Sequence, residues 1–525
     1  MKRPDIIFIV LDTQRTDRLG SYGNRRQTSL TPNLDRFADQ AVLFEQAIAP
    51  AQWTVPSHAS MFTGLYPTAH QVTQSYQSLG PDRPHLAEVL RTSGYQTVGF
   101  CNNPLVGILN NGFKRGFDTF YNYGGAFPSL PESSTNLPWP LNHLTERYTQ
   151  FLRRISYPIQ NFFGQSDLAF SISLNPLFTP LWSKLANFKG QNERSVKDVR
   201  HFLAKRERGS DKRPLFLFLN LMETHLPFWP PPEFVDKVAP YMRRDREAQA
   251  IMSRWNRDAF RWQSPLEEPL TELESRVLND MYDAEVAYQD AYLGPLLDLL
   301  AERGRRNNTL TLIVADHGDS LGEHGYMGHA FVGYQELVHV PLMVQWPQRW
   351  PAGRRISAPV STRRVYHTML DAVGMLPEKL AGVTPAEVHG LTLGETINGR
   401  DPEQSSALAE IYPPLNFVKA IERRRPDLIE SFGCQTLRRA IVQEQQKLIQ
   451  LENAARELYD LQADPLELAN LLDDRPAATA TLNFRLNQLT SQVERQRDNL
   501  TTGMAVDAEV DEHLLQRLRG LGYIE

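Results

Sequence analysis

Several apolar runs of this chain end in side chains that can bind metal ions or move protons. Three runs stop at an acid or a histidine, and the residues in question are Asp12, His225 and the pair Asp316-His317. Taken singly, such an aspartate is commonly a helix cap and such a histidine a packing residue. Agreement among three run ends favours a shared site instead. Asp12, Asp316 and His317 offer two carboxylates and one imidazole, a set that suits a divalent cation.

A threonine stands at the start of another informative stretch. Pro56 begins a short run that is expected to be helical, and Gly64 is expected to end it. Thr54 is therefore expected at or just before a helix N-terminus, where unpaired backbone N–H groups and the helix dipole favour an anion. A lone threonine there is usually a plain N-cap. Its role depends on what the fold brings beside it.

The apolar runs themselves predict the elements that position these residues. They are continuous β-branched, aliphatic and aromatic stretches, typical of strands buried on both faces of a parallel sheet, at residues 5–11, 215–222 and 309–315. Helices are expected at residues 31–41 and 85–94, and a further strand at 95–101. Strands that alternate with helices predict an α/β fold with a large, doubly wound, mostly parallel sheet. Such sheets bind ligands at the carboxyl ends of their strands.

The composition is that of a globular protein. The 525 residues suggest roughly two to four structural units. A net charge of −5 gives no reason to expect nucleic acid, and the two cysteines, Cys101 and Cys434, exclude a disulfide framework or a cysteine-rich metal site. The apolar run before Asp12 is too short for a signal peptide or a transmembrane segment, so a cytoplasmic protein is expected.

Two regions interrupt the regular alternation of elements. Residues 126–189 mix prolines, aromatic and polar residues without a clear period, and residues 228–270 resemble them. We interpret both as insertions that wall the site. The expected organisation is a catalytic α/β domain over residues 1–365 and a smaller C-terminal domain over residues 366–525.

Sequence motifs along nearly the whole chain resemble those of one known family. They include PDIIFIVLDTQRTDRLGSYGN, WTVPSHASMFTGLYPTAH, LIVADHGDSLGEHGYMGH and ELYDLQADPLELANLL. In this order they are similar to the motifs of the sulfatase family within the alkaline phosphatase superfamily. The resemblance implies a large α/β domain and a smaller α+β domain with a short antiparallel sheet.

The chain departs from the family pattern in two motifs, at three positions. Sulfatases carry cysteine or serine at the position of Thr54, within a C/S-x-P-x-R motif, and convert it to formylglycine. Threonine cannot supply that aldehyde, and His58 replaces the arginine of the motif. The family also often has two consecutive aspartates where this chain has Asp12 followed by Thr13.

The pattern is instead similar to members of the superfamily that use threonine as the nucleophile. The resemblance implies that one divalent ion is bound by Asp12, Thr54, Asp316 and His317. Coordination would lower the pKa of the Thr54 hydroxyl and orient it for attack. Formylglycine releases sulfate from a geminal diol, an exit that threonine lacks, and this favours phosphorus esters. We therefore predict a hydrolase of phosphodiesters or phosphonate monoesters. A sulfuric ester hydrolase, a phosphoryl-type group transferase and a catalytically degenerate binding protein are the alternatives.

Histidines are the best candidates for contacting the ester and moving protons, because their ordinary pKa lies near neutral pH. By family position, His225 and His329 are expected to contact the ester oxygens and protonate the leaving group. His58 is expected to orient the same anion, and Arg15 to reach the mouth of the pocket. Zn or Mn is the favoured metal, with Ca or Mg left open. The expected partner is a small-molecule, lipid or carbohydrate ester.

Overall fold

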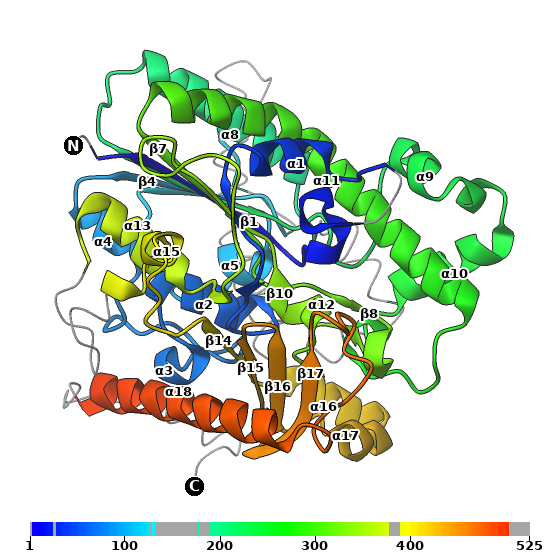
Figure 1. Ribbon diagram of the computed structural model, residues 1–525. Coiled ribbons are helices and arrows are strands. Elements are labelled where there is room, and N and C mark those ends of the chain that lie inside the picture. Colours follow the sequence, from blue (N-terminus) through cyan, green and yellow to red (C-terminus); the bar gives the residue numbers. More distant parts are fainter. Residues whose placement is uncertain are drawn as a thin grey trace, which may run out of the picture.

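A large mixed sheet forms the centre of the computed structural model, which describes residues 3–24, 28–125, 129–131, 172, 177, 188–376 and 389–502. The eight strands lie in the order β12-β2-β11-β7-β1-β6-β4-β5 (Figure 1). Their bounds are β1 Asp5–Leu11, β2 Val42–Phe44, β4 Gln96–Cys101, β5 Thr119–Asn122, β6 Leu215–Leu221, β7 Thr309–Val314, β11 Leu342–Gln345 and β12 Arg354–Ile356. Only β11 runs antiparallel to its neighbours, β2 and β7.

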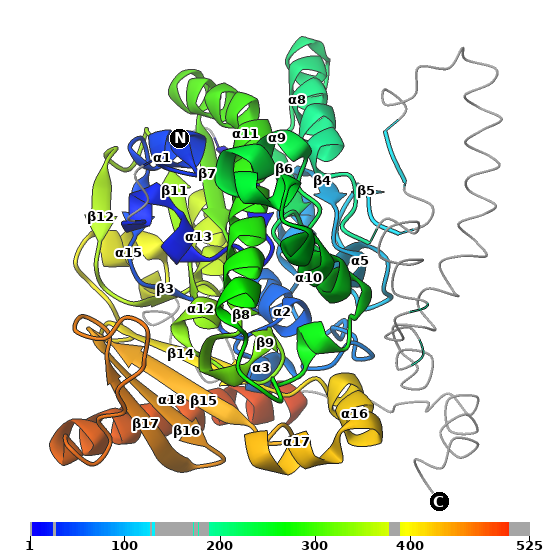
Figure 2. The ribbon, with the colours of Figure 1, turned by 90° about the vertical axis from the view of Figure 1, so that its right-hand side faces the viewer.

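Helices cover both faces of this sheet because the side chains of its strands alternate between two apolar cores. Ile6, Phe8 and Val10 of β1 point into one core. That core is covered by α2 (Thr54–Thr63), α4 (Leu86–Thr92), α13 (Arg364–Val373) and α15 (Leu393–Ile397). Ile7 and Ile9 point into the other, which is covered by α1 (Pro32–Ala38), α8 (Asn192–Arg208) and α11 (Glu272–Arg306) (Figure 2). The predicted α/β class is confirmed.

Shorter elements connect these layers. A small sheet joins β10 (His339–Val340), β3 (Ala47–Ile48) and β13 (Val360–Ser361), and β8 (Ser320–Leu321) pairs with β9 (Met327–Gly328). Short helices lie at α3 (Pro67–His70), α5 (Pro104–Gly107) and α12 (Gln335–Val338).

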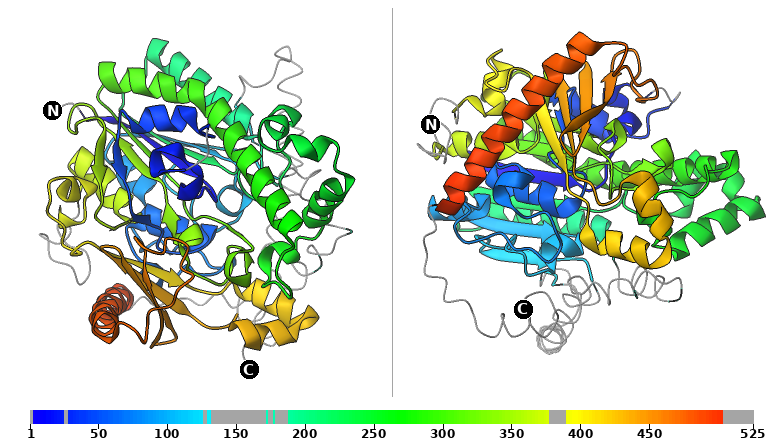
Figure 3. Two further views of the ribbon diagram at one scale, coloured as in Figure 1. Left: turned by 45° about the vertical axis from the view of Figure 1, so that its right-hand side comes forward. Right: turned by 90° about the horizontal axis from the view of Figure 1, so that it is seen from below.

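The C-terminal part forms a separate four-stranded antiparallel sheet. Its strands are β14 (Ser406–Ile411), β15 (Arg438–Gln443), β16 (Gln446–Leu451) and β17 (Ala454–Asp460), in sequence order. Helix α18 (Pro476–Thr502) lies along one face of this sheet (Figure 3). Helices α16 (Leu415–Arg424) and α17 (Pro426–Phe432) follow β14. The predicted second sheet is therefore present. The boundary at residue 365 stays a prediction, and α13 and α15 pack in the same core as the main sheet.

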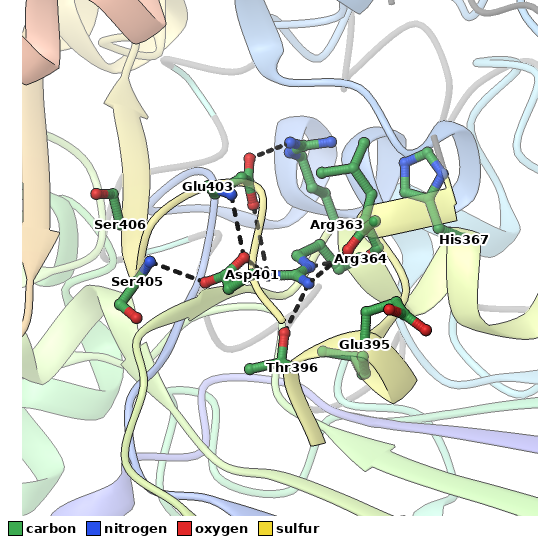
Figure 4. A network of polar contacts seen from close by, with 12 residues as sticks. Arg363, Arg364, His367, Glu395, Thr396, Asp401, Glu403, Ser405 and Ser406 are labelled. Carbon is green, nitrogen blue, oxygen red and sulfur yellow. Dashed lines mark hydrogen bonds and ion pairs between the residues drawn. The ribbon is translucent and has the colours of Figure 1, made fainter. Parts of the chain in front are cut away.

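Two buried arginines tie the part of the chain that forms the large sheet to the segment that leads into the second sheet (Figure 4). Arg364 is fully buried and donates to Asp401 at 3.0 Å, to Thr396 at 2.7 Å and to three backbone carbonyls. Arg363 pairs with Glu403 and donates to the carbonyl of Gly64 at 2.8 Å. Since Gly64 ends α2, this contact fixes the helix that begins at Thr54.

Residues 126–189 lie outside the described residues except for 129–131, 172, 177, 188 and 189. Within 228–270, α9 (Pro232–Val238), η5 (Pro240–Arg243), α10 (Arg246–Arg257) and η6 (Arg261–Gln263) pack against α11 around Trp255. Among the described residues no helix is long and apolar enough to cross a membrane.

Candidate active site

Four neighbouring parallel strands carry the site at their carboxyl ends. Strands β7, β1, β6 and β4 are adjacent and parallel, so they end at the same edge of the sheet. The residues that follow them are Asp316-His317, Asp12, Glu223-Thr224-His225 and Asn102-Asn103, respectively. The structure thus brings together the three run ends singled out in the sequence, and it adds a fourth from β4.

Asp12, Asp316 and His317 form a compact group of ligand atoms. One such atom from each lies within 4.8 Å of the others, and all three side chains are fully buried. Within the described part of the chain, Oδ1 of Asp12 and Oδ2 of Asp316 accept no hydrogen bond. Burial, with repulsion from Asp316, raises the pKa of Asp12 to about 8, and burial raises the pKa of Asp316 to about 7. A cation or protons must neutralise buried carboxylates that accept so few hydrogen bonds, and this donor set of two carboxylates and one imidazole fits a divalent ion.

His317 is oriented so that one ring nitrogen is available to this group. Its Nδ1 donates to the carbonyl of Gly318 at 2.8 Å. Nε2 therefore carries the lone pair, and it lies 3.5 Å from Oδ2 of Asp316. Burial lowers the pKa of His317, which keeps the ring neutral as a metal ligand must be.

Thr54 points into the same space from helix α2. It is the first residue of the helix and follows Trp53, whose backbone is extended. Its Oγ1 lies 3.3 Å from Nε2 of His317. The side chain is 1% exposed. A buried hydroxyl is thus held at a helix N-terminus, where backbone N–H groups favour an anion.

Asn103 links the nucleophile candidate to the candidate metal ligands, and the sequence did not single it out. Its Nδ2 donates to Oδ2 of Asp12 at 2.5 Å and lies 3.4 Å from Oγ1 of Thr54. Its Oδ1 accepts from the N–H of Leu105 and caps α5. Its position directly after a strand, at the sheet edge that bears Asp12, is the signal that could have identified it.

Thr13 replaces a potential carboxylate ligand and adopts an unusual conformation. Its φ of 59° lies in the left-handed region, which β-branched residues rarely occupy. This conformation directs its N–H toward Oδ1 of Asp316 at 3.3 Å. Its hydroxyl donates to the carbonyl of Asp12 at 2.7 Å and contacts Thr224. The residue orients Asp316 through its backbone.

The His58 ring packs against Asp316 and the backbone of its own helix. Its Nδ1 is 3.0 Å from the carbonyl of Thr54 and 3.4 Å from Oδ2 of Asp316. Its Nε2 accepts from Asn220 at 3.4 Å. Burial lowers the pKa of His58 to about 3, so the ring is neutral. The structure aims both nitrogens at protein atoms, and a contact between His58 and the ester stays a prediction.

His225 and His329 lie next to each other, beside the group formed by Asp12, Asp316 and His317. Their ring centroids are 5.0 Å apart, and those of His317 and His329 are 4.5 Å apart. Each is 7% exposed. Burial lowers the pKa of His225 to about 3 and holds that of His329 well below its usual range. The predicted pair therefore places two neutral imidazoles beside His317 at the strand ends.

Arg15 does not point its guanidinium into this space. The side chain is buried, pairs with Asp17 at 2.9 Å and Glu323 at 2.7 Å, and donates to the carbonyl of Asp319 at 3.0 Å. These partners raise the pKa of Arg15 well above its usual value, although burial acts in the opposite direction. A contact between Arg15 and substrate stays a prediction.

Comparison with known proteins decides the family. The model of the Sulfatase family matches residues 4–375. The chain belongs to the sulfatase family. Two curated relatives are each 23% identical over 95% of this chain: an N-acetylglucosamine-6-O-sulfatase of Bacteroides thetaiotaomicron, of which 88% is covered, and an arylsulfatase of Clostridium perfringens, of which 96% is covered.

Solved structures show the same fold. The phosphonate monoester hydrolase of Agrobacterium radiobacter superposes with a TM-score of 0.61 and 21% identity, over 94% of this chain and 96% of that one. The family and the fold inferred from the motifs are therefore confirmed, as is an ester hydrolase. Sulfatase-family enzymes depend on a metal, and this member has a buried group that fits one.

Proposed function

We propose that this sulfatase-family member hydrolyses phosphodiesters or phosphonate monoesters, with Thr54 as a covalent nucleophile. The observation that carries the proposal is the Thr54 hydroxyl, 3.3 Å from Nε2 of His317 at the start of α2. It occupies the position where the family pattern has the precursor of formylglycine. A hydroxyl beside buried carboxylates and a helix N-terminus is suited to attack on an anionic ester.

Asp12, Asp316, His317 and the Thr54 hydroxyl would hold one divalent ion. Zn or Mn is favoured by the imidazole, and Ca or Mg is left open by the carboxylates. When bound, such an ion lowers the pKa of a hydroxyl and neutralises charge on the ester oxygens.

The chain's own residues orient the nucleophile and account for the proton. Asn103 donates to Asp12 and reaches Thr54, which fixes the direction of the hydroxyl. A bond forms between Oγ1 and phosphorus while the bond from phosphorus to the leaving oxygen breaks. The Thr54 proton ends on that leaving oxygen. Water then attacks phosphorus, which restores the threonine hydroxyl and releases the acid.

His225 and His329 would contact the ester oxygens and pass the Thr54 proton to the leaving oxygen in the first step. In the second step they would pass a proton of the attacking water back to Oγ1 of Thr54. Their rings lie edge to face, 5.0 Å between centroids, and are neutral at rest. A neutral imidazole accepts a proton at the lone pair of Nε2 and returns it later, as general acid–base catalysis requires.

The preference for phosphorus follows from the chemistry of threonine. A formylglycine hydrate expels sulfate by cleaving the bond between carbon and oxygen. A threonine ester has no second hydroxyl on the same carbon, so release requires attack at the central atom. The phosphonate monoester hydrolase among the structural neighbours, which shows the fold, accommodates a phosphorus ester in this architecture.

A sulfuric ester hydrolase is the second candidate. It is supported by the names of the curated relatives, which include a carbohydrate sulfatase and an arylsulfatase. Both activities can be ranked with 4-nitrophenyl esters of a phosphodiester, a phosphonate, a phosphate monoester and a sulfate, with Zn or Mn supplied. We expect the highest kcat/KM for the phosphodiester or the phosphonate. A clearly higher value for the sulfate would contradict the proposal.

A further inference from the structure

Three imidazoles of the site have Nδ1 bound to an acceptor, which leaves each Nε2 for the shared space. His225 donates to the carbonyl of Leu226 at 2.5 Å, and His317 to that of Gly318 at 2.8 Å. His329 differs, because Nδ1 lies 2.9 Å from Oδ1 of Asp319. The first two acceptors belong to the backbone, so only the orientation of the His329 ring depends on a side chain.

We infer that Asp319 is a positioning residue: it fixes the ring and the tautomer of His329, so that Nε2 faces the ester. The inference rests on the proposed function, in which His329 contacts the substrate. It concerns a residue outside the proposed set of metal ligands, Asp12, Thr54, Asp316 and His317.

Apolar packing alone does not account for a buried carboxylate at Asp319. The residue is fully buried, and in the described part of the chain its Oδ2 accepts no hydrogen bond. A buried carboxylate is costly unless it is paired, and an apolar side chain of similar size would avoid that cost. The hydrogen bond with His329 offsets part of this cost, together with the charge of the nearby Arg15.

A tight hairpin places the two residues opposite each other. Strands β8 and β9 pair with Ser320 opposite Gly328. Asp319 immediately precedes β8 and His329 immediately follows β9, so both stand at the base of the hairpin. Cross-strand neighbours at such positions are close enough for their side chains to bond.

Two contacts fix the backbone at the start of the hairpin. A Cβ at Gly318 would lie 1.9 Å from the carbonyl oxygen of Glu336, so only glycine allows this approach. Arg15 donates to the carbonyl of Asp319 at 3.0 Å. The backbone of Asp319 is therefore held close to His317 and to the buried Arg15, and its carboxylate reaches His329 from there.

Matched variants of the full-length, metal-loaded enzyme test this role. Asp319→Leu removes the acceptor with little change in volume, and Asp319→Asn keeps an oxygen that can accept from Nδ1. We expect kcat on a nitrophenyl phosphodiester to fall roughly 10- to 100-fold in the leucine variant, less in the asparagine variant, with bound metal unchanged. Ser320→Ala serves as the control, because it removes a side-chain hydrogen bond of the same hairpin that goes to Glu336 and not to His329.

A double variant separates positioning from a general structural effect. If Asp319 acts through His329, Asp319→Leu/His329→Gln is no slower than His329→Gln alone. Multiplied losses, or a wild-type kcat in Asp319→Leu, would overturn the inference. Should the leucine variant fail to fold, the same comparison is made with asparagine.

Nitrogen-15 NMR of labelled histidine gives a readout that does not depend on turnover. We expect His329 to carry its proton on Nδ1 in the wild type and to lose this preference in Asp319→Leu. An unchanged tautomer would refute the positioning role. If the wild type hydrolysed none of the esters, the proposed function would fail, while the NMR result would still decide the relation between Asp319 and His329.

Discussion

The hydroxyl oxygen of Thr54 lies 3.3 Å from Nε2 of His317, although 263 positions separate the two residues. One begins helix α2 and the other follows strand β7. The contact joins a nucleophile candidate to a metal-ligand candidate at one sheet edge. The threonine that departs from the sulfatase motif thus places a hydroxyl beside a candidate metal ligand.

Removing the Thr54 hydroxyl should abolish turnover while the fold is kept. We expect Thr54→Ala to lower kcat by about 1000-fold or more, as loss of a nucleophile does. Thr54→Ser keeps a hydroxyl at the helix start and should retain measurable activity. Mass spectrometry of acid-quenched enzyme should detect a phosphorylated peptide containing Thr54 in the wild type and none in Thr54→Ala. Full turnover by the alanine variant would exclude a covalent mechanism through this residue.

The strands of the catalytic sheet could be predicted from the sequence because they are buried on both faces. β1 spans the predicted residues, and β6 and β7 end one residue before the predicted limit. Continuous apolar runs of this kind have few alternatives to a central parallel strand. The polar residues at their ends then had to meet, since parallel strands share an edge.

The remaining parts of the site depend on packing that a sequence pattern does not contain. Asn103 was missed because an asparagine before proline is typical of a helix cap, and it does cap α5 as well as bond to Asp12. The direction in which His58 faces is set by Asn220 of β6. The partner of His329 depends on the register of the hairpin formed by β8 and β9.

Asn103 should support both the metal ligand and the nucleophile. We expect Asn103→Ala to lower kcat/KM by roughly 10- to 100-fold and to weaken metal binding, because Asp12 loses the donor at 2.5 Å. Asn111→Ala is the matched control: Asn111 is also buried, and in the described part of the chain its side chain bonds to the backbone of Leu105 and Phe113 and not to Asp12 or Thr54. If both variants had the same kcat/KM per folded molecule, Asn103 would have no specific role.

The Arg364 network should matter for stability and not for chemistry. Arg364→Met leaves Asp401 and several carbonyls without their buried donor, and we expect the free energy of unfolding to fall by about 3–5 kcal/mol. Arg400→Ala removes an exposed partner of Glu395 on the neighbouring segment and should cost less than about 1 kcal/mol. Denaturant unfolding followed by circular dichroism measures both. A small loss in Arg364→Met would show that the network contributes little.

Metal binding should be coupled to the release of protons from two carboxyl groups. The pKa of Asp12 is raised to about 8 and that of Asp316 to about 7, so at pH 6 the metal-free protein carries protons on both. A divalent ion must displace them, so we expect about two protons released per ion at pH 6 and few at pH 9. Affinity for Zn or Mn should therefore rise with pH across this range.

The same shifts fix how the stability of the metal-free protein depends on pH. Both carboxyls bind protons more tightly in the folded than in the unfolded chain, whose aspartates titrate near pH 3.9. The unfolded chain thus loses its protons first, and the stability contributed by these groups falls as pH rises from about 4 to about 8.

The protons released when the metal binds are counted by calorimetric titration with the metal in buffers of different ionisation enthalpy. Asp12→Asn should reduce this count by about one. A proton count near zero at pH 6 would show that the two carboxyls are already ionised before the metal binds.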